Sequence, residues 1–482
     1  MKQIIYILVF GVILSACNDF LDYKDGDKVI PDELEQYSEL IYGELVRKSI
    51  GATCYNTWIM SDDYMSSIPS WIGETNTDER ENYFSWYTWA AETQITPRGD
   101  ELIDPAWEHF YHKILMCNII EKEVGEFEDD LEGVKFRLLG EVQVIRAMSY
   151  WYLLNLYGEP FRDAEQAKGA MGVPVNTETG IEDHLYTREP LAEVYKLIET
   201  DLQNALQNLD KGEQKNSIFH PNQDVARLFL SRVYLEQKRY EDVIAVCNTA
   251  MEKTSRSIMS LADMANYTNE DTPMLNKNNG SILFSWADRD ALPCSSNNYY
   301  QQGIFAPSTE LLALFASNDL RNKGYALVDL WDPGKVIKYE VNFSGCYTMN
   351  YRLEEFYFNR AEAYIETGQW ETGMEDLNVV YSQRIEGGEG KLSATSVEDA
   401  RECLRTEKRK EFCFEDMRWF DIRRWNLSVE HRYHDFSMDG TYRTYVLEEG
   451  SPNYVLPIPL DIQRRNFEIE QPERVDIEPT IN

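Results

Sequence analysis

Side chains that carry out catalysis occur in this chain, but not at the spacings that catalytic or metal sites require. No Ser-His-Asp order, glycine-rich phosphate loop or zinc motif is found. His109 and His112 lie three residues apart, as do His431 and His434, and we interpret both pairs as unliganded. Four aspartates could contribute to a calcium site, but no Asp-x-Asp-x-Asp-Gly loop contains them: Asp62, Asp63, Asp100 and Asp104. We therefore expect a protein that is not an enzyme and has no cofactor and no metal site.

Two stretches combine aromatic rings with amides and charges, a mixture that suits binding. Sugar rings have apolar C–H faces and polar rims, and Tyr and Trp offer an apolar body with a polar tip. The candidate ligand-binding residues are Trp71, Arg80, Trp86 and Trp89 in the first stretch, Asn297, Asn298, Tyr299 and Tyr300 in the second, and Trp331. The alternative for each aromatic residue is packing within its own loop region or against a partner protein.

These residues lie in two long irregular regions, 51–105 and 281–347, and loops of such length within a compact domain are usually functional. Elsewhere apolar residues recur at helical spacing, which predicts a mainly helical fold with a few short strands. The predicted helices cover about residues 34–48, 106–124, 131–157, 189–209, 222–251, 352–384 and 396–425.

Two of the helical segments share one pattern of small and aromatic residues. The pattern is Ser231, Tyr234, Tyr240, Val243, Cys247 and Ala250 in the first segment, and Ala361, Tyr364, Trp370, Gly373, Leu377 and Val380 in the second. The spacings are identical, and small residues at helix crossings with aromatic residues between helices are typical of tetratricopeptide hairpins. We expect a third hairpin from 131–157 with 189–209, and a fourth from 34–48 with 106–124.

The N-terminus has the pattern of a bacterial lipoprotein signal. One cation precedes an apolar run from Ile4 to Leu14, which is too short to span a bilayer, and Leu14-Ser15-Ala16-Cys17 follows. This predicts a signal peptide over 1–16 and a mature chain that begins at an acylated Cys17. Residues 17–31 are polar and acidic, and we interpret them as a flexible tether to a single domain over 32–482.

Charge and cysteine content narrow the partners further. The net charge of −36 argues against nucleic acid and anionic lipid as partners. Cys117 and Cys247 fall on apolar helix faces and are predicted to be core residues. At most one disulfide is expected, with Cys294 and Cys346 as the possible pair.

Several stretches, in order, resemble the SusD/RagB family of outer-membrane nutrient-uptake lipoproteins. The matching stretches are Trp107, Tyr111, Ile114 and Asn118; Glu141 with Arg146-Ala147, Tyr150, Leu153, Tyr157-Gly158 and Pro160; Glu193-Val194-Tyr195 with Asp201-Leu202; Lys338-Tyr339, Arg352, Arg360-Ala361-Glu362-Ala363 and Asn378; the signature from Glu407 to Trp425; and Leu456-Pro457-Ile458-Pro459. Lys408 replaces the usual first arginine of the signature, and the tail after Gln463 departs from the family pattern.

The resemblance implies a SusD-like fold, in which four tetratricopeptide-like hairpins support an irregular loop-rich region. It also implies a SusC-like TonB-dependent barrel in the outer membrane as the partner, with this lipoprotein as a surface-exposed lid that captures oligosaccharide. A RagB-like oligopeptide binder with the same lid role is the alternative, and a structural scaffold or a surface enzyme is a more distant one. Glu407, Glu411, Glu415 and Arg418 are expected to pair with one another along one helix, because they lie three or four residues apart.

Overall fold

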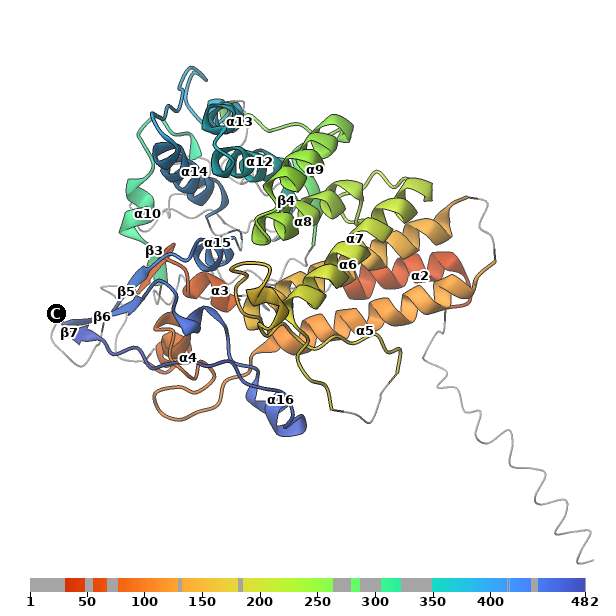
Figure 1. The fold of residues 1–482 in the computed structure, drawn as a ribbon, viewed down its shortest axis with the longest axis horizontal. Coiled ribbons are helices and arrows are strands. Elements are labelled where there is room, and N and C mark those ends of the chain that lie inside the picture. Colours follow the sequence, from red (N-terminus) through yellow and green to blue (C-terminus); the bar gives the residue numbers. More distant parts are fainter. Residues whose placement is uncertain are drawn as a thin grey trace, which may run out of the picture.

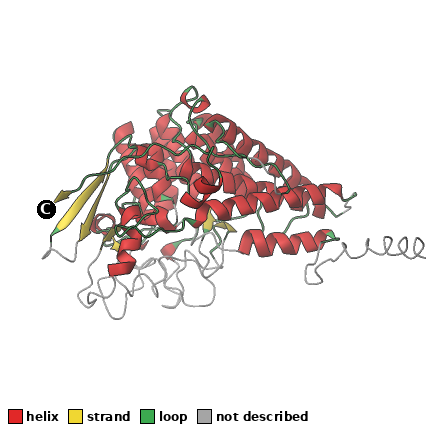
Figure 2. Cartoon of the chain, turned by 90° about the horizontal axis from the view of Figure 1, so that it is seen from below, coloured by secondary structure: helices red, strands yellow, loops and turns green. Residues whose placement is uncertain are grey.

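The computed structural model describes residues 31–47, 55–66, 77–128, 132–180, 185–262, 279–286, 305–321, 349–413, 415, 417–434 and 441–481. Helices make up most of this part, and the strands are few and short (Figures 1 and 2). Within the described ranges, no helix combines the length and apolar character needed to cross a membrane.

The predicted helical segments are all present. They are α2 (Leu34–Leu40) with the π-helix η1 (Ile41–Arg47), α5 (Pro105–Glu126), α6 (Val134–Tyr157), α7 (Leu191–Lys211), α8 (Gln223–Glu236), α9 (Tyr240–Lys253), α12 (Glu354–Glu366), α13 (Trp370–Ser382), α14 (Val397–Phe412) and α15 (Arg418–Trp425). Helix α2 packs on α5, α6 on α7, α8 on α9 and α12 on α13, which are the four predicted hairpins. The mainly helical fold is thus confirmed.

The two hairpins that share the sequence pattern, α8–α9 and α12–α13, have the same turn between their helices. Lys238 and Gly368 each follow their repeat tyrosine by four residues, and both have left-handed backbone, with φ of 56° and 82°. Gly373 lies where α13 crosses α12, because a Cβ there would be 2.8 Å from the Ala361 carbonyl oxygen. In the other hairpin Val243 takes this position and is fully buried. The sequence pattern therefore marked real helix crossings.

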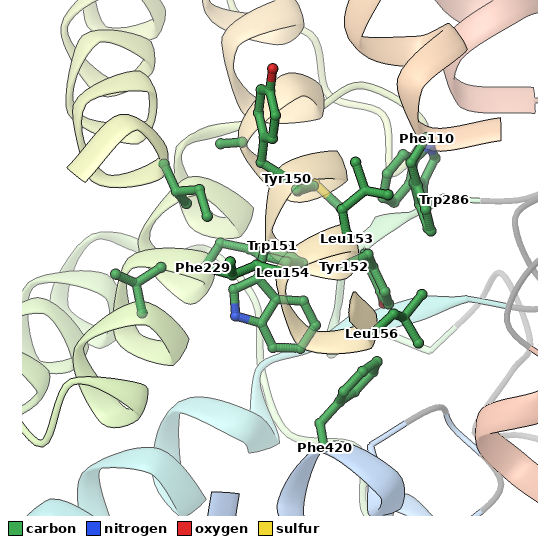
Figure 3. Packing of buried hydrophobic residues seen from close by; sticks show 14 of the residues in the cluster. Phe110, Tyr150, Trp151, Tyr152, Leu153, Leu154, Leu156, Phe229, Trp286 and Phe420 are labelled. Carbon is green, nitrogen blue, oxygen red and sulfur yellow. The ribbon is translucent and has the colours of Figure 1, made fainter. Parts of the chain in front are cut away.

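Helix α6 is the centre of the core and is buried on nearly all sides (Figure 3). Trp151 makes edge-to-face contacts with Phe229 and Phe420, with ring centroids 5.5 and 4.9 Å apart. Trp286 is fully buried beside these rings, and its Nε1 donates a hydrogen bond to the Leu45 carbonyl oxygen at 2.7 Å. Apolar residues surround α6 because other elements cover every face of it.

Three small antiparallel sheets complete the described fold. Strand β1 (Tyr64–Ser66) pairs with β3 (Phe305–Pro307), β2 (Ile282–Ser285) pairs with β4 (Asn350–Arg352), and β5 (Val429–His434), β6 (Tyr442–Leu447) and β7 (Thr480–Ile481) form the third sheet. The remaining elements are α3 (Tyr55–Ile59), α4 (Thr77–Tyr87), η4 (Gln166–Lys168), α10 (Thr309–Ala313), η6 (Pro452–Tyr454) and α16 (Leu460–Arg465).

Two expectations about the elements were wrong. The region 51–105 contains helix α4, which has no apolar stripe in its first half and is held by the aromatic residues of its last turns. The segment 396–425 is not one helix, because α14 ends at Phe412 and α15 begins at Arg418. Cys117 and Cys247 are buried as predicted, whereas Cys294 and Cys346 lie outside the described residues.

Candidate functional site: an aromatic cluster where two loop regions meet

The two predicted loop regions are joined by strand pairing. Strand β1 belongs to the first region and β3 to the second, and they pair antiparallel with Tyr64 opposite Pro307 and Ser66 opposite Phe305. A short ribbon therefore fixes two segments that lie more than two hundred residues apart in the sequence. Strand β5, which belongs to another sheet, packs against β1.

Five aromatic residues from four elements gather around this ribbon, and we call them the aromatic cluster: Tyr64, Tyr83, Phe84, Phe305 and Tyr433. The rings of Tyr83 and Phe305 meet edge to face with centroids 6.0 Å apart, and those of Phe84 and Tyr433 do so at 4.9 Å. All except Phe305 are half-buried and reach the surface from the core. Asn82 is exposed and precedes Tyr83 on α4. Half-exposed rings next to an amide are what a C–H face with a polar rim would require.

Tyr87 connects the ribbon to the strand behind it. Its hydroxyl accepts a hydrogen bond from the Ser66 backbone N–H at 2.9 Å and donates to the Arg432 carbonyl oxygen at 3.1 Å. The Tyr87 ring also lies 5.2 Å from that of Phe305. The buried end of α4 therefore sets the relative position of β1, β3 and β5.

Trp86 and Trp89 do not act as ligand-binding plates, and this corrects the prediction. Both side chains are fully buried, and Trp89 Nε1 donates to the Met60 carbonyl oxygen at 3.0 Å. A ring with no exposed surface cannot stack on a ligand from outside. These two residues instead belong to the hydrophobic core.

The other predicted ligand residues are not placed by the structure. Arg80 lies on α4, but its side chain is not described. Trp71, Asn297, Asn298, Tyr299, Tyr300 and Trp331 lie outside the described residues, as does the predicted lipidation site Cys17.

His431 lies between the rings of Tyr87 and Trp89, with centroids 4.2 and 4.1 Å away. Its Nδ1 is 2.7 Å from the Tyr87 carbonyl oxygen and its Nε2 is 2.9 Å from that of Ser61. Burial lowers the pKa of His431 to about 4, although both carbonyl contacts and the Asp62 carboxylate act against it. The ring is therefore neutral near pH 7 and donates through one nitrogen only. Within the described ranges, no three His, Cys, Asp or Glu side chains are grouped as metal ligands would be.

Two arginines of the signature segment hold the start of β1. Arg418 makes a bidentate contact with the Asp62 carboxylate, at 2.7 and 2.8 Å, and Arg409 Nε lies 2.9 Å from the Asp63 carboxylate. Burial opposes ionisation of Asp62, but Arg418 and Arg409 outweigh it and hold the pKa of Asp62 far below its usual range. Helices α14 and α15 thus fix the base of the β1–β3 ribbon.

The expected pairing of signature residues along their own helix was mostly wrong. Glu411 accepts from Arg384 and Arg352, which belong to other elements, and Glu415 accepts from Arg352. Glu407 does pair with Lys410 on the same helix, but it also accepts from Arg321 at 2.6 Å. The acidic side chains point into the protein, where cations of neighbouring segments neutralise them.

Sequence reasoning missed Arg474 in the C-terminal segment. Its guanidinium donates to the carbonyl oxygens of Ala91, Ala90 and Asn453 at 2.9, 2.7 and 3.1 Å. Burial lowers the pKa of Arg474 to about 9. These contacts hold the turn after α4, where Trp89 has a left-handed backbone with φ of 50°. The sequence around Arg474 does not reveal this role, because the acceptors are backbone carbonyl oxygens, which every residue has.

The described chain is a scaffold of helical hairpins with a partly exposed aromatic cluster, and solved structures of the SusD superfamily share its fold. A SusD superfamily protein from Bacteroides thetaiotaomicron has a TM-score of 0.71 at 20% identity, over 92% of this chain and 98% of that chain. A SusD-like carbohydrate binding protein from Bacteroides vulgatus has a TM-score of 0.66 at 16% identity, over 90% and 96% of the two chains.

Sequence comparison specifies the family. The SusD family model matches residues 233–472, and a second model, described as starch-binding associating with outer membrane, matches residues 19–235. A SusD-like protein from Bacteroides ovatus is 23% identical over half of this chain, a match that spans 40% of the relative's length. A second SusD-like protein, from Formosa agariphila, is 24% identical over 38% of this chain and 32% of its own length. The two matches together span residues 19–472, and the chain belongs to the SusD family.

Proposed function

We propose that this protein is a cell-surface lipoprotein that captures oligosaccharide and closes as a lid over a SusC-like TonB-dependent outer-membrane transporter. The observation that carries the proposal is the β1–β3 pairing, which brings both predicted ligand regions to one aromatic cluster. Partly exposed aromatic rings bind the C–H faces of sugars, and a neighbouring amide such as Asn82 binds their hydroxyls. Capture requires no bond to be made or broken, so the protein acts without catalysis.

The predicted lipidation of Cys17 and the acidic residues that follow it in the sequence favour the lid role. One acyl chain alone gives only marginal membrane binding, whereas an acylated cysteine with more than one chain anchors stably. A polar tether over 17–31 allows the folded part to move relative to the membrane without leaving it.

A glycan array and a peptide-mixture pulldown, both on protein lacking residues 1–17, test the ligand class. We expect binding of oligosaccharide, and a loss of about tenfold in affinity for Tyr83→Ala, since one ring contact is removed. Tyr42→Ala is the matched control, because Tyr42 is 38% exposed on η1, which packs against α5 and α6. Recovered peptides with no response to any glycan would contradict the oligosaccharide assignment.

Membrane fractionation and affinity purification test location and partner. Cys17→Ala should release a folded protein from the outer-membrane fraction, unless the transporter alone retains it. Purification of the full-length protein from membranes should recover a TonB-dependent barrel. If no barrel is recovered under gentle detergent conditions, the lid role is wrong, while the ligand assignment is judged by the array.

A further inference from the structure

A second candidate site lies among the helical hairpins and shares no residue with the aromatic cluster. A cavity of about 420 Å³ opens between α5, α6, α7 and the segment 176–179. Cavities of roughly 300–1,000 Å³ are typical of small-molecule sites. The proposed function does not use this cavity.

The floor of the cavity is a rigid charged network. Arg146 makes two hydrogen bonds to the Asp201 carboxylate, at 2.8 and 2.7 Å. Its Nη1 also donates to Asn118 Oδ1 at 3.0 Å and to the Glu121 carboxylate. The Arg146 charge is thus neutralised by protein carboxylates, and it does not by itself attract an anion.

The loop wall of the cavity is fixed from two helices. Asn118 Nδ2 donates to the carbonyl oxygens of Asn176 and Glu178, at 2.9 and 3.1 Å. The Tyr150 hydroxyl accepts from the Asn176 N–H at 2.9 Å and lies 3.0 Å from its carbonyl oxygen. Both Asn118 and Tyr150 are more than nine-tenths buried. The cavity is therefore pre-formed, which lowers the entropic cost of binding.

Three polar groups at this cavity have no partner among the described residues: the Lys122 ammonium and the hydroxyls of Thr177 and Thr179. Lys122 is exposed, and no described carboxylate neutralises it. Leu197 adds a half-buried apolar surface. The groups available to a ligand in this cavity are therefore one cation, two hydroxyls and an apolar surface.

We propose that this cavity binds a small hydroxylated carboxylate of the size of one sugar acid. The ligand carboxylate pairs with Lys122, ligand hydroxyls exchange hydrogen bonds with Thr177 and Thr179, and a C–H face packs on Leu197. The remaining lone pairs of Glu121 accept further ligand hydroxyls. A neutral sugar would leave the Lys122 charge unused and would bind more weakly.

Calorimetry and NMR titration on protein lacking residues 1–17, with D-galacturonate, D-glucuronate and D-glucose as probes, test this site. We expect at least one uronate to bind about tenfold more tightly than glucose, and Lys122→Gln to remove that difference. Lys122→Arg should preserve it. Lys253→Gln, which removes an exposed lysine from α9, is the control and should have no effect.

Thr177→Val with Thr179→Val is a second test, because it removes both hydroxyls and leaves Lys122 in place. Uronate affinity should fall about tenfold while the melting temperature stays unchanged. The proposal is wrong if neither uronate binds saturably, or if binding is the same in the Lys122→Gln protein. Tyr83→Ala should leave uronate binding intact, so this result does not depend on the oligosaccharide proposal.

Discussion

Glu411 on α14 is a carboxylate that three arginines share, and its replacement by glutamine tests how buried charge holds this fold together. It accepts from Arg384 Nη2 at 2.8 Å and from Arg352 Nη1 at 2.9 Å, and Arg321 Nη1 lies 3.4 Å away. All four side chains are at most 1% exposed. Glutamine has nearly the same shape, but it carries no charge and turns two N–H donors toward guanidinium groups.

The expected loss of unfolding free energy follows from the contacts that remain. Removal of one partner from a buried ion pair costs about 3–5 kcal/mol. Arg384 keeps Glu354 and Arg352 keeps Glu415, at 2.8 and 3.0 Å, and glutamine retains one acceptor oxygen. We therefore expect Glu411→Gln to lower the unfolding free energy by about 3 kcal/mol, the lower end of that range. The total unfolding free energy of a typical protein is about 5–15 kcal/mol. Glu430→Gln is the control, because its partner Arg432 is exposed and such pairs contribute less than about 1 kcal/mol.

Urea unfolding at pH 7, followed by fluorescence and far-UV circular dichroism together, measures the loss. Burial raises the pKa of Glu411, but Arg384 and Arg352 outweigh it and hold the pKa well below its usual value of 4.5. Stability from a group with a lowered pKa is present above 4.5 and is lost as the pH falls below it. The difference in unfolding free energy between the two proteins should therefore shrink as the pH falls below 4.5. A loss below about 1 kcal/mol at pH 7, or a difference that does not change with pH, would refute the reasoning.

Three further predictions use the same unfolding assay. Burial lowers the pKa of His431 from 6.5 to about 4, so the contribution of this residue to stability is present above pH 6.5 and is lost as the pH falls toward 4. The His431→Gln variant should therefore lose up to about 3 kcal/mol less stability than the parent protein over this range. Identical stability–pH profiles for the two proteins would contradict this prediction. Burial raises the pKa of Asp104 from 3.8 to about 6, so the favourable contribution of this residue to stability is lost as the pH rises through 6. The Asp104→Asn variant can still cap α5 and should be more stable than the parent protein above pH 6, by about 1–3 kcal/mol. A loss of stability above pH 6 would contradict this prediction. The Gly373→Ala variant places a Cβ 2.8 Å from the Ala361 carbonyl oxygen and should lower the unfolding free energy by about 1–3 kcal/mol. The control is Gly125→Ala on α5, where a Cβ has nothing within 4 Å, and it should raise the unfolding free energy by up to about 1 kcal/mol. Equal effects of the two substitutions would mean that α12 and α13 do not cross closely at Gly373.

The helical scaffold is readable from the sequence because its information is local. Apolar periodicity marks α5, α7, α8 and α9, the long apolar segment 131–157 marks α6, and the spacings around Tyr234 and Tyr364 mark the hairpins. Each of these patterns requires only residues within one or two helices of each other. Helix α4 escaped prediction because its first half has no apolar stripe and its position is set by aromatic packing onto distant strands.

The partners of the charged residues were not readable. Spacing along α14 suggested that its acids pair with one another, yet Glu411 pairs with Arg384 and Arg352, and Arg418 pairs with Asp62. A helix has several faces, and spacing alone does not say whether a face turns to solvent or to a buried cation. That choice depends on which segment packs there.

The sequence by itself determined the family and the helical repeats, and it predicted two regions for the ligand-binding residues. Only the tertiary structure decided that Ser66 lies opposite Phe305, that Trp86 and Trp89 are core residues, and that Tyr64, Tyr83, Phe84 and Tyr433 are partly exposed. The physical reason is that an aromatic side chain has the same local sequence signal whether it is buried or exposed. Its exposure is set by contacts with residues hundreds of positions away, such as the stacking of His431 on Tyr87 and Trp89.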